Sequence, residues 1–424
     1  MIDLSAAPTL DRLLPMLCET AMDIHLDVYL VGGVIRDLLL RRSTVDFDFA
    51  VEGDAIEFTR ELAARHGGTL TMHPTFRTAT WSYQELEIDF ATARTETYPE
   101  PAMLPVVTPA SIDLDLYRRD FTINALALRL NEPRQLIDLY GGQEDLRSGI
   151  IRVLHDHSFI DDPTRLFRAV RFEQRLNFHI EPHTFSLIAP ALPYISRLSG
   201  ERLRYEFELI FSEDEPEKSL HRLHDLGLLT YLDSGLIFDE TLYNAFRSYR
   251  LLAADQQYAQ NSWHIKTNSA INIGWALLGS RTRDPEQMAR RLMLDRTATL
   301  AVHGGQRIAK LLDKVASAQK PSEVDALLND LPTEVLVAGS VLASGDTRAK
   351  VTAYATTWRY VTPLLSGKDF TNWGLSPGPL FGKLLRGLRT ARLDGQISSL
   401  EQEREFVQRV IAQMAADDAT GEDA

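Results

Sequence analysis

The order of apolar and polar positions divides the chain into two unlike parts. Up to about residue 150, short apolar runs alternate with polar positions and are separated by glycine-containing turns, a pattern typical of strands joined by short helices. A glycine turn with a short helix is expected within residues 135–153. This order predicts a head with a small sheet. Strands are expected at residues 27–33, 44–51, 69–73, 78–83 and 86–94, and helices at residues 34–42 and 123–130.

Beyond residue 150 the apolar positions recur three and four apart, as on one face of a helix. The sequence therefore predicts an α+β fold, with a small mixed sheet in the head and only helices after it. The acidic C-terminal end is expected to be disordered. The expected domains are a head at residues 1–150, a helical neck at 151–215, a helical body at 216–350 and a helical tail at 351–424.

Composition narrows the class of protein. Of 424 residues, 44% are apolar and 25% are charged, which suits folded domains rather than a disordered chain. No apolar run reaches the roughly 18 residues of a membrane span, and the N-terminus lacks a signal pattern. With Cys18 as the single cysteine, we expect a cytoplasmic protein with no membrane partner. The net charge of -14 argues mildly against a polyanionic partner, but local clusters of arginine can override such a total.

The stretch VGGVIRDLLLRRSTVDFDFA, residues 31–50, sets a glycine pair ahead of two acids. In a strand, Asp46 and Asp48 point to one face, and Phe47 and Phe49 point to the core. Two carboxylates on one face attract a divalent cation, and Mg²⁺ above all binds such oxygens together with substrate phosphates. A solvated face of an edge strand would explain the same pair without a metal.

The glycines indicate what the metal would activate. Gly32 and Gly33 end the first strand and open a helix, where backbone N–H groups can approach phosphate oxygens. Arg36 falls on the first turn of that helix, and Asp89, on another expected strand, is a candidate third acid for the same catalytic group. An ordinary strand-to-helix turn and an exposed strand acid are the structural alternatives.

Five motifs in order carry a resemblance to a known family. They are VGGVIRDLLL with DFD, then DLYRRDFTINALAL, LIDLYGGQEDL, DDPTRLFRAVRF and SGERLRYEFELI. This order resembles the class II tRNA nucleotidyltransferase and bacterial poly(A) polymerase family over residues 28 to about 212. The segment SGKDFTNWGLSPGPLFGKLLRGLRTARLDGQI is similar to the tail of bacterial CCA-adding enzymes. The resemblance implies a polymerase-beta-like nucleotidyltransferase head.

The resemblance also implies roles for the residues of the first two motifs. Gly33 and Arg36 would contact a nucleoside triphosphate, and Asp46 and Asp48 would hold the metal. The second motif would place further nucleotide-binding groups near the sugar and the phosphates, namely Arg118, Arg119, Asp120 and Asn124.

The fourth motif is the most informative. In the family it usually begins Glu-Asp, and that Asp together with an Arg three residues later reads the incoming base, so that no template is needed. Here the stretch begins Asp161-Asp162, and Arg165 follows. Asp162 would accept from the exocyclic amino group that C and A carry, and each such contact is worth roughly 1–3 kcal/mol of discrimination. Arg168 and Arg171 would add to the positive lining of the nucleotide site.

Structural readings exist for the fourth and fifth motifs and for a histidine pair that precedes them. Asp162 followed by Pro163 is a good N-cap and first-turn pair, and the arginines after it would then form a solvated stripe. The fifth motif is expected to support this helix, with Glu201 and Arg202 as pairing candidates. HDH at residues 155–157 resembles a metal pair, but it lacks a third ligand nearby and is expected to lie in a loop.

The family implies a function. The chain would transfer CMP, AMP or both from CTP and ATP to the 3′ end of tRNA, with Mg²⁺, as a CCA-adding or A-adding enzyme. The tail would bind the acceptor end of tRNA, although a solvated helix face would explain its basic residues equally well. The candidates for RNA contacts are Lys383, Arg386, Arg389 and Arg392.

Three other functions remain as alternatives. A poly(A) polymerase is the nearest, but such enzymes tend to end in a basic segment, whereas this chain ends acidic. A CC-only adding enzyme is disfavoured because the segment before RRD has close to full length. A non-catalytic RNA-binding protein is disfavoured because the acids and both arginine-rich motifs are intact.

Overall fold

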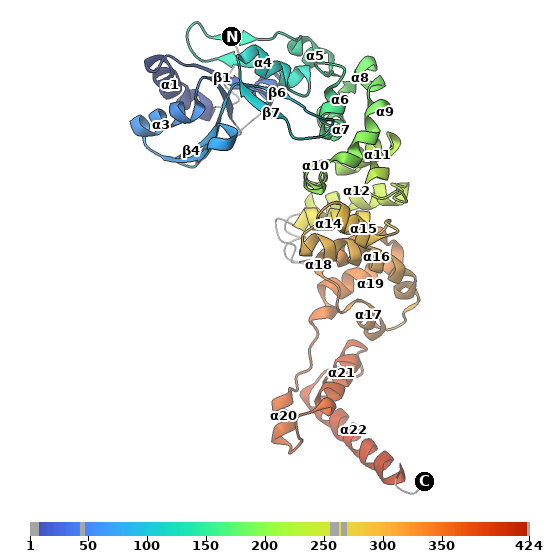
Figure 1. The fold of residues 1–424 in the computed structure, drawn as a ribbon. Helices are drawn as coiled ribbons and strands as arrows, with labels where there is room; N and C mark the ends of the chain where they lie inside the picture. The colour runs from blue at the N-terminus through green and yellow to red at the C-terminus, as the bar shows by residue number, and fades with distance from the viewer. Residues whose placement is uncertain (1–7, 43–46, 255–262, 264–268, 422–424) are drawn as a thin grey trace. The chain divides into compact units, whose positions relative to one another are not determined.

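The structure, a computed structural model, describes residues 8–42, 47–254, 263 and 269–421 (Figure 1). The described chain forms two compact units. The first runs to residue 206 and includes residues 225–231, and the second contains residues 207–224 and everything from residue 232 onward. The four expected domains are a finer division, which stays a prediction.

A seven-stranded sheet forms the base of the first unit, with the strand order β3-β4-β5-β2-β1-β8-β9. β2 and β5 run parallel, and the other neighbouring strands run antiparallel. The expected α+β fold, with a mixed sheet in the head and mostly helices after it, is therefore confirmed. The expectation of helices alone beyond the head is wrong at residues 179–180, which form the short strand β11. The strands are β1 (Asp27–Val31), β2 (Asp48–Glu52), β3 (Thr69–His73), β4 (Thr78–Tyr83), β5 (Leu86–Thr92), β8 (Ala127–Arg129) and β9 (Gln135–Ile137).

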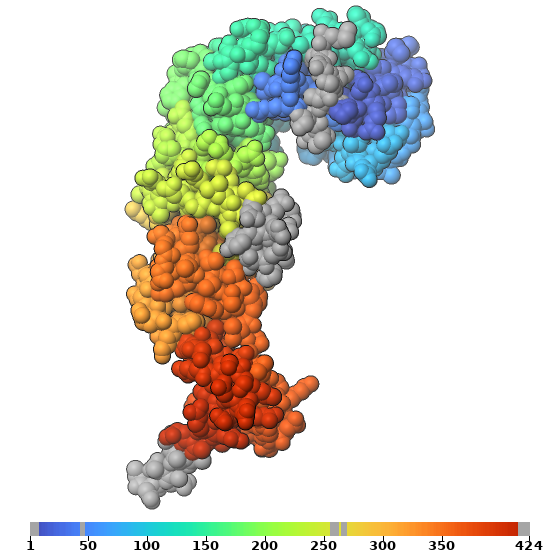
Figure 2. Space-filling model, turned by 180° about the vertical axis from the view of Figure 1, so that it is seen from behind, coloured from blue at the N-terminus to red at the C-terminus, as the bar shows by residue number. Residues whose placement is uncertain are grey.

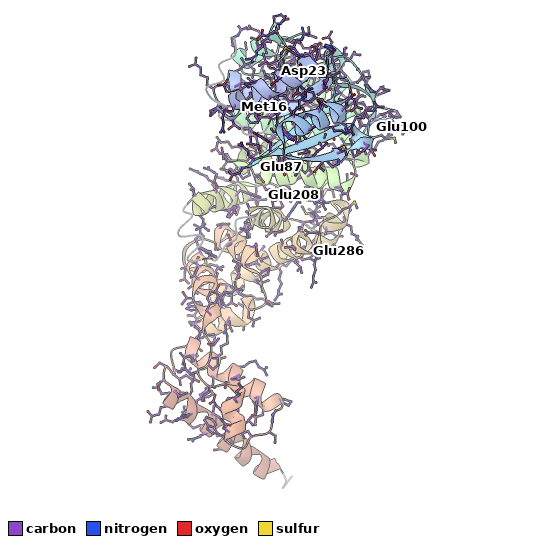
Figure 3. The ribbon with its side chains drawn as sticks, turned by 90° about the vertical axis from the view of Figure 1, so that its left-hand side faces the viewer. Met16, Asp23, Glu87, Glu100, Glu208 and Glu286 are labelled. Carbon is purple, nitrogen blue, oxygen red and sulfur yellow. The ribbon has the colours of Figure 1, made fainter. Side chains whose placement is uncertain are left out.

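Helices and a small hairpin surround this sheet. Phe58 of α3 packs on Phe90 of β5 with ring centroids 5.2 Å apart, and Phe90 stacks on Phe49 of β2 at 5.1 Å. Arg65 of α3 pairs with Asp23 at the end of α1, which is labelled in Figure 3. These elements are α1 (Pro8–Asp23), α2 (Gly33–Leu39), α3 (Ala55–His66), α4 (Ile112–Tyr117), α5 (Gly142–Ser148) and the hairpin of β6 (Arg94–Thr97) and β7 (Val106–Pro109).

The part of the first unit that follows the seven-stranded sheet is mostly helical. Its long helices are amphipathic, and their apolar positions, such as Leu166, Phe167 and Val170, are buried. The strands β10 (Ile150–Ile151) and β11 (His179–Ile180) pair in parallel beside them. The helices are α6 (Ser158–Asp161), α7 (Thr164–Leu176), α8 (Pro182–Ser186), α9 (Ile188–Ala191) and α10 (Gly200–Phe211), whose last residues belong to the second unit.

The prediction of a helix at residues 123–130 is wrong. Residues 122–124 form a single 3-10 turn, and residues 127–129 form β8, which lies between β1 and β9. Residues 123–128 are all buried. A short run that is buried on both faces carries no periodicity, so its sequence cannot separate a strand from a helix.

The second unit is made of helices among the described residues. Two glycines let α14 and α16 pack closely, since a Cβ on Gly305 would lie 1.9 Å from the carbonyl oxygen of Ala276 and one on Gly279 would lie 2.3 Å from that of Val302. The helices are α11 (Pro216–Asp225), whose last residue belongs to the first unit, α12 (Glu240–Ala254), α14 (Ser269–Gly279), α15 (Pro285–Arg291), α16 (Arg296–Ser317), α17 (Pro321–Leu328), α18 (Thr333–Leu342), α19 (Gly345–Thr356), α20 (Gly367–Asn372), α21 (Pro379–Leu393) and α22 (Leu400–Gly421).

The tail has an apolar core of its own, in which Phe370, Leu384, Leu388 and Val407 are buried. Its helices α21 and α22 form the red surface in Figure 2. Helix α22 includes residues 415–421 of the end expected to be disordered, and the last three residues lie outside the described part. None of the described helices has the length and apolar character that a membrane crossing requires.

Candidate active site

The first strand ends at a backbone turn that favours glycine. β1 is followed by Gly32, with φ +77°, and α2 begins at Gly33. A Cβ on Gly32 would lie 2.7 Å from Nη1 of Arg119, far inside van der Waals contact. The absent side chain therefore lets Arg119 approach the backbone between β1 and α2.

Two acids lie side by side on neighbouring strands of the sheet. Asp48 of β2 is in register with Asp89 of β5 in the parallel pair, and both side chains are exposed. The flanking Phe47 and Phe49 are buried, as the alternation of a strand predicts. Thr80 donates a hydrogen bond from Oγ1 to Oδ1 of Asp89 at 2.5 Å, which orients that carboxylate.

The other half of the predicted acid pair, Asp46, lies outside the described residues. The described part of the chain contains no group of three His, Cys, Asp or Glu side chains arranged to hold a metal ion. The structure therefore brings Asp48 and Asp89 together and leaves the predicted pairing of Asp46 with Asp48 as a prediction.

Asp115 organises the arginines of the second motif. Its Oδ1 accepts from Nη2 of Arg118 at 2.8 Å, and its Oδ2 accepts from Nη2 of Arg119 at 2.9 Å. Burial alone would raise the pKa of Asp115, but the charges of Arg119 and Arg118 outweigh it and lower the pKa. Arg118 also donates to Glu96 at 2.9 Å. Arg118 is thus held by two carboxylates, whereas Arg119 has one carboxylate partner among the described residues.

Asp120 connects the second motif with the fourth. Its Oδ2 accepts from Nε and Nη2 of Arg168 at 2.8 and 2.6 Å, and its Oδ1 accepts from Nδ2 of Asn124 at 3.0 Å. Asn124 accepts in turn from Nη1 of Arg36 at 2.7 Å. Burial raises the pKa of Asp120, but Arg168 and the hydrogen bond from Asn124 outweigh it and lower the pKa to about 2. The four side chains form one hydrogen-bonded chain.

The fourth motif combines a helix start with paired charges. Asp162 accepts from the backbone N–H of Thr164 at 3.0 Å, so the structural reading of this aspartate is also present. It pairs with Nη2 of Arg202, in the fifth motif, at 2.6 Å. Arg165 is buried and donates to Oγ of Ser158 at 2.6 Å and to the carbonyl oxygen of Arg118 at 2.7 Å. The fifth motif therefore supports this helix through Arg202.

These groups line one cavity of about 810 Å³, which lies wholly in the first unit. Among the described residues, its wall contains seven arginines and seven acids. The arginines are Arg36, Arg118, Arg119, Arg165, Arg168, Arg171 and Arg175, and the acids are Asp48, Asp89, Glu96, Asp115, Asp120, Asp162 and Glu206. The predicted residues Gly32, Gly33 and Asn124 line it too. An arginine-lined cavity with two exposed acids at its edge suits a polyphosphate that binds together with a metal ion.

Comparisons with known proteins match this arrangement. Residues 28–152 match the model of the Poly A polymerase head domain, and residues 177–236 match that of the probable RNA and SrmB-binding site of polymerase A. The A-adding tRNA nucleotidyltransferase of Halalkalibacterium halodurans is 33% identical over 93% of this chain and 91% of its own length. The chain belongs to the tRNA nucleotidyltransferase family.

Other members of this family extend the match. The A-adding tRNA nucleotidyltransferase of Geobacter sulfurreducens is 35% identical over 92% of this chain, which spans only 46% of that relative's length. A solved structure of a CCA-adding enzyme, apo form II, is 30% identical, with a TM-score of 0.84 over 95% of this chain and 96% of that chain. The Thermotoga maritima CCA-adding enzyme complexed with tRNA_CCA gives a TM-score of 0.77 at 30% identity.

The RNA-binding candidates of the family's tail fall into two classes. Lys383 and Arg386 of α21 are exposed. Arg389 instead pairs with Asp325 at 2.7 Å, and Arg392 pairs with the fully buried Glu403 at 2.8 Å. Steps of three residues turn a helix by about 300°, so positions 383 and 392 face opposite ways.

The loop interpretation of HDH is confirmed, since residues 155–157 precede α6 without forming a helix or strand. His155 lies 4.0 Å from Asp161, and Asp156 pairs with His183 at 2.8 Å.

Sequence reasoning missed several residues of the cavity wall, among them Glu96, Asp115, Phe172, Arg175 and Glu206. The ring of Phe172 has the guanidinium carbons of Arg36, Arg168 and Arg171 within 5.0 to 5.4 Å of its centroid, which suits cation–π attraction. In the sequence Phe172 is one more apolar position of a helix, and Asp115 is one of two acids in a short helix. The arginine pair after Asp115 was the one available signal that a carboxylate partner was needed.

Proposed function

We propose that this chain transfers AMP, CMP or both from ATP and CTP to the 3′ end of tRNA without a nucleic-acid template, in the cytoplasm. The main support for this proposal is that Asp48 and Asp89, the arginines of the second motif and the residues of the fourth motif line the same cavity. The family supports the same reaction, since the relatives above are A-adding enzymes and the similar solved structures are CCA-adding enzymes. Because the chain spans only 46% of the length of the Geobacter sulfurreducens relative, its activity is proposed from its own residues.

The acids at the edge of the cavity fit a divalent cation. Asp48 and Asp89 offer carboxylate oxygens from neighbouring strands, and such hard oxygen ligands are those that Mg²⁺ prefers. We assign Asp48, together with Asp46 of the same motif, to hold the ion and Asp89 to support it. When bound, Mg²⁺ neutralises charge on the reacting phosphate and favours the ionised form of the attacking 3′ hydroxyl.

The arginine wall is suited to bind the triphosphate. Gly32 and Gly33 expose backbone at the cavity, and Arg119 lies against Gly32. Arg36 and Arg168 are held in place through Asn124 and Asp120. Guanidinium groups fixed in this way bind phosphate oxygens with less loss of side-chain entropy than free ones do.

The base would be read at the start of α7. Asp162 is held by Arg202 through one carboxylate oxygen, Oδ1, and can accept from the exocyclic amino group of C or A through its other oxygen. Arg165 has five N–H groups and uses two of its nitrogens on Ser158 and on the backbone of Arg118, so further N–H groups are available to a ring nitrogen. A site whose polar groups are left unpaired by U or G rejects those bases strongly.

A poly(A) polymerase is the second candidate, because the matching family model is described as a Poly A polymerase head domain. Product length separates the two. Labelled ATP and CTP are offered singly and together to tRNA that lacks its last three nucleotides, ends in one C or ends in CC. One added A on the CC end supports the proposal, and added CMP distinguishes full CCA addition from A addition. A long A tail, CC addition alone or no product would contradict it.

A further inference from the structure

Glu206 is an acid of the cavity wall to which the proposed reaction gives no role. It lies in α10, only 4% of its surface is exposed, and it lines the cavity. Its Oε2 is buried and accepts no hydrogen bond from the described residues. A carboxylate held in this way is costly in its ionised form, so the position of Glu206 calls for an explanation.

Charges of both signs face Glu206. Nη2 of Arg171, in α7, lies 4.0 Å from Oε2 of Glu206, which is outside hydrogen-bonding distance. Arg168, also in α7, attracts the carboxylate of Glu206 but is hydrogen-bonded to Asp120. Asp162 and Asp120 repel it. Burial raises the pKa of Glu206 and the two arginines lower it, with the net effect of raising it to about 7. The carboxyl group is therefore divided between its two protonation states near neutral pH.

A nucleotide in this cavity would change that balance in one direction. A triphosphate adds negative charge and competes for the same guanidinium groups, and the ligand excludes water from the cavity. Each of these changes favours the neutral carboxylic acid. An ionised Glu206 would in turn draw Arg171 and Arg168 away from phosphate oxygens.

We propose that Glu206 is a proton-coupled positioning residue, which takes up a proton when a nucleoside triphosphate binds and thereby frees the neighbouring arginines for the nucleotide. This inference rests on the proposed function, since it assumes that the nucleotide occupies the cavity. By linkage, a ligand whose binding takes up a proton binds more weakly as the pH rises. If the bound state is fully protonated, the uptake at pH 7 is about half a proton per nucleotide, and affinity falls about eightfold from pH 6.5 to pH 8.

Calorimetry tests this directly. Binding of ATP with Mg²⁺, without RNA, is measured at pH 7 in buffers of low and high ionisation enthalpy, and the difference in heat gives the number of protons exchanged. Wild type is compared with Glu206→Gln, which keeps the shape and cannot titrate. Glu201→Gln is the matched control, because Glu201 lies on the same helix and is exposed. We expect wild type and Glu201→Gln to take up about half a proton more than Glu206→Gln does.

The outcomes are separable. Equal proton numbers in wild type and Glu206→Gln, or proton release that depends on Glu206, would overturn this inference and leave the proposed function standing. Failure of ATP to bind the wild type would overturn both. If Glu206→Gln does not fold, the ATP affinity of the wild type from pH 6.5 to pH 8 decides, and affinity that does not fall over that range contradicts the proposal.

Discussion

Gly32 and Arg119 approach each other so closely that a single methyl group would separate them: a Cβ on Gly32 would lie 2.7 Å from Nη1 of Arg119. Gly32→Ala must move this guanidinium, which loosens its pair with Asp115. It also places alanine at φ +77°, which costs about 1–3 kcal/mol. We expect kcat/KM for ATP to fall at least tenfold. Gly141→Ala is the control, at φ +75° with nothing within 4 Å, and equal activity of the two variants would contradict this account.

Base choice is expected to depend on Asp162 and Arg165. Replacing either by alanine should loosen the choice among ATP, CTP, UTP and GTP by about tenfold or more, since one such contact carries roughly 1–3 kcal/mol. Arg202→Met removes the partner of Asp162 and should loosen it less. Competition among the four nucleotides measures this, with the exposed Arg197→Met as control. Unchanged selectivity in both alanine variants would remove the assignment.

Because Asp120 is paired with Arg168, we expect the free energy of unfolding to depend on pH in the acid range. The folded pKa of Asp120 is about 2 and its ordinary value is 3.8, so this group stabilises the fold above about pH 4 and loses that effect as the pH falls towards 2. The shift corresponds to about 2 kcal/mol. Denaturant unfolding from pH 5 to pH 2.5 should therefore show that the difference in free energy of unfolding between wild type and Asp120→Asn shrinks as the pH falls. A constant difference would contradict the prediction, and Asp156→Asn, at an exposed pair, is the control.

The basic residues of α21 are expected to separate into two behaviours. Replacing Lys383 and Arg386 by Gln should weaken tRNA binding, more so at low salt, without changing the unfolding temperature. Arg392→Gln should lower that temperature, since it leaves the buried Glu403 without its cation, a loss of several kcal/mol at buried sites. Filter binding at two salt concentrations and thermal unfolding measure the two effects. Destabilisation by the Lys383 and Arg386 changes would refute the division.

Local patterns predicted much of the head because they follow from chain geometry. Alternation placed Phe47 and Phe49 inside and Asp48 outside, and the glycine pair marked the turn after β1. The helix expected at residues 123–130 failed because a strand inside a sheet loses the alternation of an exposed one. The pairing of β8 with β1 and β9 depends on the rest of the fold, and the sequence of residues 127–129 alone does not show it.

The site residues that were missed depend on contacts between distant elements. Glu206 belongs to a helix whose sequence looks amphipathic, and its burial near Arg171 of α7 involves residues far apart in the sequence. Sequence spacing also does not reveal that Arg389 is paired, since its partner Asp325 lies 64 residues away. Sequence spacing shows which groups share a face, but it does not show what packs against that face.

The central claim is that the acid edge of the cavity performs nucleotide transfer, and labelled AMP incorporation into tRNA ending in CC tests it most directly. Wild type, Asp48→Asn and Asp89→Asn are compared with and without Mg²⁺, with folding checked by thermal unfolding. We predict incorporation by wild type only with Mg²⁺, a loss of at least about a hundredfold in Asp48→Asn, and a smaller loss in Asp89→Asn. Near-normal incorporation by a folded Asp48→Asn variant would contradict the account.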